Sequence, residues 1–367
     1  MEETINIIDL FCGAGGFSQG FKLAGYDIKI GIDFDKNVGE TFSRNHENTL
    51  FLHEDISSIT GKHIIDKLDK GTKIDCIIGG PPCQGFSVVG NRDIDDPRNK
   101  LYKNFIQIVD DIRPKVFVME NVSGLLTMAK GTVIKQIEED FNRLDYHVSY
   151  RVMNASEYGI PQNRKRVIFI GLRKDLGVIP SFPEPLFTER KVTIGDTLLD
   201  LPQDDSTDTT RYISQPQNAY QALMRKTITI EDFYNEVYDL NNALLINNTI
   251  YNHNIEYFTQ HKINKMIEHK ERHLRKGSGF GMRFFSYDKV GYTLTSHFQS
   301  NYEMLHPIQD RPRFFTVREG ARIQGYMDDY IFYGGKTSIA KQIGNSVPVL
   351  LSYCIARHIK NIFKTIR

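Results

Sequence analysis

The sequence predicts an α/β protein built on a mostly parallel β-sheet with helices on both faces. Short β-rich apolar runs alternate with segments of helical periodicity, which is typical of consecutive βαβ units. With 367 residues, 40% of them hydrophobic and 25% charged, the chain is long enough for a sizeable core and one smaller domain. The runs expected to form strands are INIIDL, DIKIGID, CIIGG, KVFVME, HVSYRVMNA and RVIFIGL.

Helical spacing is clearest in two segments of the chain. Between residues 99 and 112 the apolar positions recur at helical intervals, as Leu101, Phe105, Ile108, Val109 and Ile112. After Pro348 a second segment carries one apolar stripe, made of Leu350, Leu351, Cys354, Ile355, His358, Ile359 and Ile362. We expect a helix in each.

A change of pattern after FPEP, near residue 185, predicts a domain boundary. The chain continues into the polar run LPQDDSTDTT and an asparagine-rich stretch without a clear period, and order returns at RPRFFTVREGARIQGY. We therefore expect a first domain over residues 1–185, a smaller second domain over 186–310, and a segment over 311–367 that returns to the first domain.

Composition limits the location and the chemistry. No run approaches about 18 apolar residues, and the start MEETINIIDL lacks a basic region, so we expect no membrane association, no export and a cytoplasmic location. The four cysteines, Cys12, Cys76, Cys83 and Cys354, form no CxxC pair, which argues against a zinc site and a disulfide framework. We expect no metal.

The net charge of +1 conceals a local excess of basic residues between His261 and Gly291. Such a stretch can contact phosphates, or it can be an ordinary solvated helix face.

The first chemical signal is DLFCGAGGFSQGF, residues 9 to 21. Glycines directly after a strand and before a helix let a ligand approach the main chain. Asp33 follows Gly13 by twenty residues, at the end of the next strand, where a carboxylate can bind ribose hydroxyls. The glycine spacing is not GxGxxG, which favours S-adenosylmethionine over NAD; the alternative is a plain tight turn.

Cys83 and Glu120 follow two other predicted strands. Cys83 comes after Pro81 and Pro82, on a rigid loop past the carboxyl end of a strand, where open α/β sheets bind ligands. A cysteine held in this way is better explained as a nucleophile than as a core residue, whereas we expect Cys76, Cys354 and Cys12 to be buried hydrophobes. Glu120 would project into the same crevice.

Two arginines, Arg164 and Arg166, alternate onto one face as the chain enters another strand. Adjacent like charges on a sheet cost energy unless they meet anions, and the candidates are a substrate carbonyl, a phosphate and Glu120.

Taken together and in this order, these motifs resemble those of the cytosine-C5 DNA methyltransferases over nearly the whole chain. DLFCGAGGF is similar to the family's cofactor loop, GGPPCQGFS to its nucleophile motif, ENV to its glutamate motif and QNRKR to its arginine motif. RFFTVREGARIQGY and KQIGNSVP are similar to the two closing motifs. The resemblance implies a Rossmann-like methyltransferase fold, with residues 1–185 catalytic and cofactor-binding and residues 186–310 a target-recognition domain.

The same resemblance implies the reaction. Cys83 attacks carbon 6 of cytosine, Glu120 holds N3 and the exocyclic amine, and Arg164, joined by Arg166, contacts O2 and supports the neighbouring loop. The resulting enamine takes a methyl group from S-adenosyl-L-methionine at carbon 5, and elimination of Cys83 leaves 5-methylcytosine. The implied cofactor contacts are Phe11, Gly13, Gly16, Asp33, Phe34, Asp55, Ile56, Pro81, Leu101, Asn345 and Val347.

The resemblance also implies a partner, double-stranded DNA, from which the target base must be flipped. Ser87 and Arg92 are candidates for contacts from a closing loop, and Arg283 and Gln299 for reading base edges. We expect a monomer that modifies DNA in a restriction-modification system, with a possible cognate endonuclease. The alternatives are a transfer-RNA methyltransferase of the same family, a catalytically silent DNA-binding relative and a dehydrogenase; the last does not explain Cys83 beside Glu120.

Overall fold

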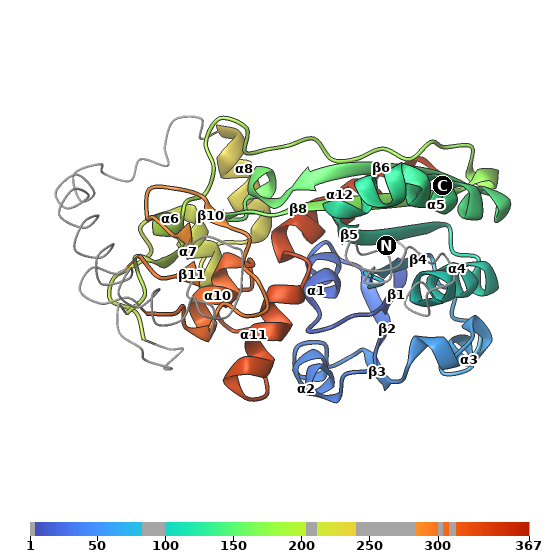
Figure 1. Ribbon diagram of the computed structural model, residues 1–367, viewed down its shortest axis with the longest axis horizontal. Helices are drawn as coiled ribbons and strands as arrows, with labels where there is room; N and C mark the ends of the chain where they lie inside the picture. Colours follow the sequence, from blue (N-terminus) through green and yellow to red (C-terminus); the bar gives the residue numbers. More distant parts are fainter. Residues whose placement is uncertain are drawn as a thin grey trace.

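The computed structural model describes residues 4–82, 100–202, 211–239, 283–299, 304–307 and 313–366. Its centre is a seven-stranded sheet in the order β3-β2-β1-β4-β5-β8-β6 (Figure 1). The strands are β1 Asn6–Leu10, β2 Asp27–Asp33, β3 Leu50–His53, β4 Cys76–Gly79, β5 Val116–Val122, β6 Tyr146–Asn154 and β8 Lys165–Arg173.

The sheet is mostly parallel, as the sequence predicts. Strands β3, β2, β1, β4 and β5 pair in parallel, whereas β8 runs antiparallel to both of its neighbours. A mostly parallel sheet of this order is what the predicted Rossmann-like class requires. The carboxyl ends of β2, β1, β4 and β5 therefore lie side by side at one edge.

Helices cover both faces of the sheet because successive strand residues point to opposite sides. On β4 and β5, Cys76, Ile78, Val116 and Val118 belong to one hydrophobic cluster, and the alternate residues Ile77, Phe117 and Met119 to another. The first cluster includes residues of α1 Gly16–Leu23, α2 Lys36–Asn45 and α12 Val349–Thr365. The second includes residues of α3 Gly61–Ile65, α4 Lys100–Ile112 and α5 Thr132–Arg143.

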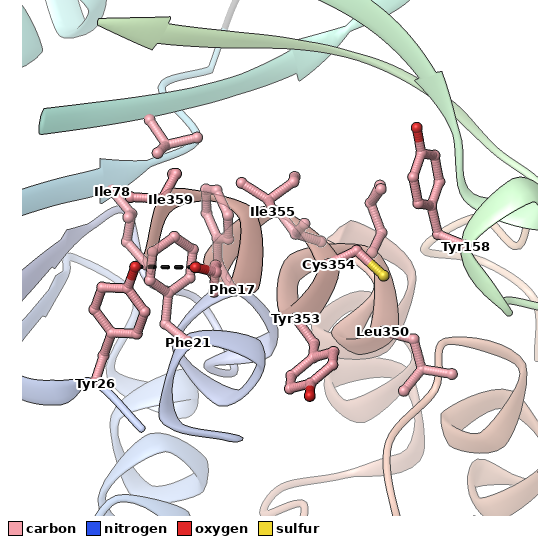
Figure 2. Packing of buried hydrophobic residues seen from close by; sticks show 14 of the residues in the cluster. Phe17, Phe21, Tyr26, Ile78, Tyr158, Leu350, Tyr353, Cys354, Ile355 and Ile359 are labelled. Carbon is pink, nitrogen blue, oxygen red and sulfur yellow. Dashed lines mark hydrogen bonds between the residues drawn. The ribbon is translucent and has the colours of Figure 1, made fainter. Parts of the chain in front are cut away.

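The C-terminal helix α12 packs directly on α1, which follows the first strand. Phe17 and Phe21 of α1 lie beside Ile355 and Ile359 of α12 (Figure 2). Gly20 permits this approach, since a Cβ placed there would lie 2.3 Å from the Ser352 hydroxyl. The C-terminal helix is thereby held against the helix that follows the first strand.

The described parts of residues 186–310 lie at the other end of the molecule from α4 (Figure 1). They form short elements, namely α6 Ile194–Leu198, α7 Ala219–Met224, α8 Ile230–Asp239, β9 Arg283–Phe284, β10 Gly291–Tyr292 and β11 Met304–Leu305. Ile194, Leu198 and Phe298 share a hydrophobic cluster with residues of α10 Val317–Ile323 and α11 Lys336–Asn345. This part of the chain is thereby fixed to the C-terminal segment.

The remaining elements are short connections. They are β7 Gln162–Asn163, which pairs with β10, and the 3-10 turns η1 Ile56–Ser58, η4 Ser123–Gly131, η5 Ala155–Tyr158 and η6 Lys174–Leu176. In the ranges described above, no helix has both the length and the apolar character needed to cross a bilayer. Cys12, Cys76 and Cys354 are buried free thiols, which confirms the reading of these three as core residues.

Candidate active site

The loop from β1 to α1 turns sharply at the carboxyl edge of the sheet. Phe11, Gly13 and Gly15 all have positive φ angles, of 62°, 52° and 85°. The N–H of Gly15 closes the turn by donating to the carbonyl of Cys12 at 2.9 Å. A Cβ placed on Gly13 would have no heavy atom within 4 Å, so the main chain is open to a ligand at that residue. Such a loop leading into a helix can accommodate a polar ligand.

Asp33 ends the neighbouring strand and is bonded to this loop. Its Oδ2 accepts from the N–H of Gly13 at 3.0 Å, and its Oδ1 accepts from the N–H of Asp35 at 2.9 Å. Burial raises the pKa of Asp33, and the two N–H donors oppose that shift. Phe34 follows with 68% of its surface exposed, so its ring is not part of the core. An exposed ring beside this carboxylate can stack on a flat ligand.

The other predicted cofactor residues lie on several elements. Asp55 is exposed and accepts from the N–H of Ser57 at the start of η1, while Ile56 is buried. Leu101 is partly buried in the first turn of α4. Asn345 is the exposed last residue of α11, and Val347 approaches the loop, since a Cβ on Gly16 would lie 2.5 Å from its carbonyl oxygen.

Adjacent strands bring the main chain before Cys83 against Glu120. Parallel pairing places Gly79 of β4 beside Met119 of β5. A Cβ on Gly80 would lie 3.2 Å from Oε2 of Glu120, so the carboxylate faces the start of the Gly-Pro-Pro segment. Asn121 is buried, and its Nδ2 donates to the carbonyl of Pro81 at 2.9 Å. The main chain at Gly80 and Pro81, which precedes Cys83 in the sequence, is therefore held by β5.

The two arginines have different partners. The Nε of Arg166 lies 2.7 Å from Oε1 of Glu120, and both side chains are 14% exposed. Arg164 is buried and donates instead to the carbonyls of Leu294 (3.0 Å), Gly344 (2.8 Å) and Ser346 (3.2 Å). Burial, with a contribution from the charge of Arg166, lowers the pKa of Arg164, although a guanidinium stays protonated at neutral pH.

The segment around Gln162 joins three parts of the chain. The Oε1 of Gln162 accepts from the N–H of Leu294 at 3.0 Å, and its Nε2 donates to the carbonyl of Ile323 at 2.8 Å. With the bonds of Arg164, this links residues 291–294, the C-terminal helices and the strand that carries Arg166. The arrangement can hold a recognition segment in register with the Glu120 carboxylate.

The sequence is similar to those of known proteins over almost its whole length. The family model for C-5 cytosine-specific DNA methylases matches residues 5–361. The chain belongs to this family. It is a DNA cytosine-5-methyltransferase.

Two relatives match almost the full length of the methyltransferase. Type II methyltransferase M.DdeI from Desulfomicrobium norvegicum is 37% identical over 393 residues, which cover 99% of this chain and 90% of the relative. Type II methyltransferase M1.HphI from Haemophilus parahaemolyticus is 34% identical, with 96% and 86% covered.

Solved structures share the fold. A structure described as a DNA modification methyltransferase encoded within an E. coli prophage has a TM-score of 0.71 and 28% identity, covering 98% of this chain and all of the other. The Dnmt2 methyltransferase of S. pombe has a TM-score of 0.60 over 98% of this chain and 99% of its own. At 17% identity, that second likeness shows the fold alone.

Several predicted site residues of the methyltransferase are not placed by this geometry. Cys83, Ser87 and Arg92 lie outside the described residues. Arg283 has its backbone in β9, where it pairs with Met304 of β11. Gln299 contacts the main chain of the C-terminal segment: its amide nitrogen reaches the carbonyl of Lys336 (3.1 Å), and its oxygen the N–H of Val317 (3.2 Å). The catalytic role of Cys83 and the DNA contacts of Ser87, Arg92, Arg283 and Gln299 stay predictions.

The structure adds residues that the sequence did not single out. Asn121 follows Glu120 in the ENV motif, and its place in that motif is the signal that could have drawn attention to it. Tyr330 and His46 lie behind the glycine loop with no motif to mark them. Across the described residues, no group of three or more His, Cys, Asp or Glu side chains is arranged to hold a metal.

Proposed function

We propose that this enzyme transfers a methyl group from S-adenosyl-L-methionine to carbon 5 of a cytosine flipped out of double-stranded DNA, through a covalent adduct with Cys83. The observation that carries the proposal is the position of the Glu120 carboxylate. It faces Gly80, three residues before Cys83, and it is paired with Arg166. A thiol and a carboxyl group on neighbouring strand ends can act on opposite sides of one pyrimidine.

The residues around the glycine loop fit the cofactor. The main chain at Gly13 is open, Asp33 is fixed at the end of β2, and Phe34 presents an exposed ring. These groups would hold the amino acid part, the ribose and the adenine, with Asp55 and Ile56 at the adenine edge and Asn345 and Val347 closing the pocket. When bound, S-adenosyl-L-methionine supplies an electrophilic methyl group.

The first chemical step is addition of the Cys83 thiolate to carbon 6. A sulfur–carbon bond forms, the double bond between carbons 5 and 6 opens, and its electron pair spreads toward N3 and O2. Glu120 stabilises that charge by holding N3 and the exocyclic amine as a hydrogen-bond partner and acid. Carbon 5 thereby becomes nucleophilic. Methylation at carbon 5 would leave S-adenosylhomocysteine. Loss of the carbon-5 proton to water and cleavage of the bond between the Cys83 sulfur and carbon 6 then release 5-methylcytosine and return the thiolate.

The two arginines divide the supporting roles. Arg166 holds Glu120 in place through their ion pair. Because its guanidinium lies beside that carboxylate, we assign to Arg166 the contact with O2 of the cytosine that Glu120 binds. Arg164 has its terminal nitrogens bonded to three carbonyls, so we assign it the support of the neighbouring segments rather than the contact with O2.

We assign DNA recognition to residues 186–310, which include Gln299 and, in β9, Arg283. Ser87 and Arg92 would lie on the loop that closes over the flipped base. Extrusion of the base costs a few kcal/mol, which contacts from such a loop can offset.

The relatives named as type II methyltransferases support a biological role. We propose that the protein is the modification enzyme of a restriction-modification system, acting as a cytoplasmic monomer alongside an endonuclease that cuts the same unmethylated site.

The test is methyl transfer from labelled S-adenosyl-L-methionine to duplex DNA and, in parallel, to transfer RNA. Transfer to duplex DNA alone is expected, and bisulfite sequencing of DNA from cells expressing the protein then identifies the modified site. Transfer to RNA alone would replace the DNA proposal by the RNA alternative. No transfer to either, from a protein that binds DNA, would indicate a silent relative.

A further inference from the structure

The hydroxyl of Tyr330 supports the glycine loop from behind. Tyr330 lies between α10 and α11, is 9% exposed, and donates to the carbonyl of Ala14. Ala14 lies between Gly13 and Gly15, and both of these glycines have left-handed backbone angles. A Cβ placed on Gly15 would lie 2.8 Å from the Tyr330 oxygen, so the contact requires glycine at that position.

His46 contacts the same hydroxyl from the end of α2. Its Nε2 lies 3.4 Å from the Tyr330 oxygen and 2.7 Å from a Cβ placed on Gly15. The imidazole is 1% exposed and stacks on Phe42, with ring centroids 4.5 Å apart. Burial, with a contribution from Lys22, lowers the pKa of His46 to about 3, so the ring is neutral at physiological pH. Since Tyr330 donates its own proton to Ala14, the geometry assigns the Nε2–H tautomer to His46.

The loop is thus fastened on two sides. On one side the N–H of Gly13 donates to Asp33, the predicted ribose ligand. On the other side the carbonyl of Ala14 accepts from Tyr330, 316 residues away in the sequence. Because Gly13 and Gly15 flank Ala14, the loop can adopt many other conformations once one of these two hydrogen bonds is lost.

We propose that Tyr330, supported by His46, is a positioning residue that keeps the glycine loop in its cofactor-binding conformation. The inference rests on the proposed function, because it takes the loop to be the S-adenosylmethionine site. A protein whose binding-competent state is only partly populated binds its ligand more weakly by that fraction. Loss of the hydroxyl should therefore weaken cofactor binding without any loss of a direct contact.

The experiment is calorimetric titration of the full-length protein with S-adenosylhomocysteine, together with thermal unfolding without ligand. The Tyr330→Phe variant keeps the ring and removes only the hydroxyl. We expect its Kd to rise about 5- to 20-fold, as for the loss of one buried hydrogen bond to a carbonyl. In methyl-transfer assays the KM for the methyl donor should rise while kcat stays close to that of the wild type.

Tyr146→Phe is the matched control. Tyr146 is fully buried and donates to the carbonyl of Pro114, which lies beside the amino end of β5, at the edge of the sheet opposite the site. This variant loses the same kind of bond, so it should unfold at a lower temperature and keep the wild-type Kd. A merely structural role for Tyr330 would give the same pattern as Tyr146→Phe.

His46→Leu provides a second, independent variant. It leaves the Tyr330–Ala14 bond in place and removes its support, so a smaller rise in Kd, of about 2- to 5-fold, is expected. A wild-type Kd in whichever of the two loop variants folds would overturn the inference. Failure of the wild-type protein to bind S-adenosylhomocysteine would instead refute the cofactor assignment, and the inference with it.

Discussion

Asn121 offers a sharp test of how the nucleophile is positioned. Its Nδ2 donates to the carbonyl of Pro81 at 2.9 Å, and Asn121 is 7% exposed. Asn121→Ala leaves that carbonyl without its donor, which costs about 1–3 kcal/mol in a buried environment. The rigid Pro81-Pro82 dipeptide transmits any shift of this carbonyl to Cys83. If the full cost appears in the transition state, kcat falls about 5- to 150-fold.

The assay is methyl transfer at saturating DNA and S-adenosyl-L-methionine, with the Kd for S-adenosylhomocysteine measured alongside. The side chain of Asn121 bonds to Pro81 and Val122 and not to Asp33 or Gly13, so the Kd should change much less than kcat. Asn6→Ala is the control: the Nδ2 of Asn6 donates to the carbonyl of Lys73 at 2.9 Å, at the start of β1 and away from the site. A wild-type kcat in Asn121→Ala would refute the positioning role.

Three further predictions concern Glu120, Asp33 and His46. Glu120→Gln keeps the shape of the side chain but loses the acid and the ion pair with Arg166. The rate of methyl transfer should therefore fall at least about 100-fold, while the Kd for the cofactor stays unchanged. Near-normal turnover would contradict the role of Glu120 as an acid. Asp33→Asn should raise the Kd for S-adenosylhomocysteine about 10- to 150-fold, as for hydrogen bonds to a charged group, and an unchanged Kd in titration calorimetry would exclude Asp33 as a ligand. Because the folded-state pKa of His46 is about 3, below its unfolded value of 6.5, the unfolded chain binds the extra proton first, and this group destabilises the fold as pH falls from 6.5 toward 3. We therefore expect the free energy of unfolding of the wild type, measured in urea relative to that of His46→Leu, to fall as pH is lowered from 6.5 to 3, by at most about 1.4 kcal/mol per pH unit. Above pH 7 the difference between the two proteins should be constant. The same dependence on pH in both proteins across the whole range would contradict this.

Local patterns in the sequence predicted every strand of the central sheet except β3, because each of the others is a short apolar run that one can read without knowing its neighbours. CIIGG became β4 and KVFVME became β5, with the expected carboxylate at the end of β5. The antiparallel direction of β8 could not be read in this way. An apolar run such as RVIFIGL fits a buried strand of either direction, and only the path of the chain decides between them.

The site was predicted where a side chain acts through its own position in a motif. Asp33 lies at the end of its strand, as its spacing of twenty residues from Gly13 had indicated. Its carboxylate also accepts a hydrogen bond from the glycine loop. Arg164 and Arg166 share one motif, yet the burial of Arg164 against three carbonyls depends on residues 294, 344 and 346, far along the chain. Long-range contacts of this kind leave no local pattern.

The helices α6, α7 and α8 were missed for a related reason. They are 5, 6 and 10 residues long, so their periodicity extends over too few turns to be recognised. Their stability comes from burial against the C-terminal segment, as for Ile194 and Leu198 beside α10 and α11. The sequence therefore predicted a boundary near residue 185 but none of these helices beyond it.

The central claim is that the Cys83 sulfur bonds to carbon 6 of an extruded cytosine. The direct measurement uses a pool of duplex DNA in which every cytosine is 5-fluorocytosine, so that all recognition sites are present. Fluorine at carbon 5 cannot leave as a proton does, and the adduct is trapped. With S-adenosyl-L-methionine, the account predicts a denaturation-resistant protein–DNA complex whose peptide map places the linkage at Cys83, and none with Cys83→Ala. A covalent complex linked through another residue would contradict this claim. So would the absence of any covalent complex from an enzyme that methylates ordinary DNA.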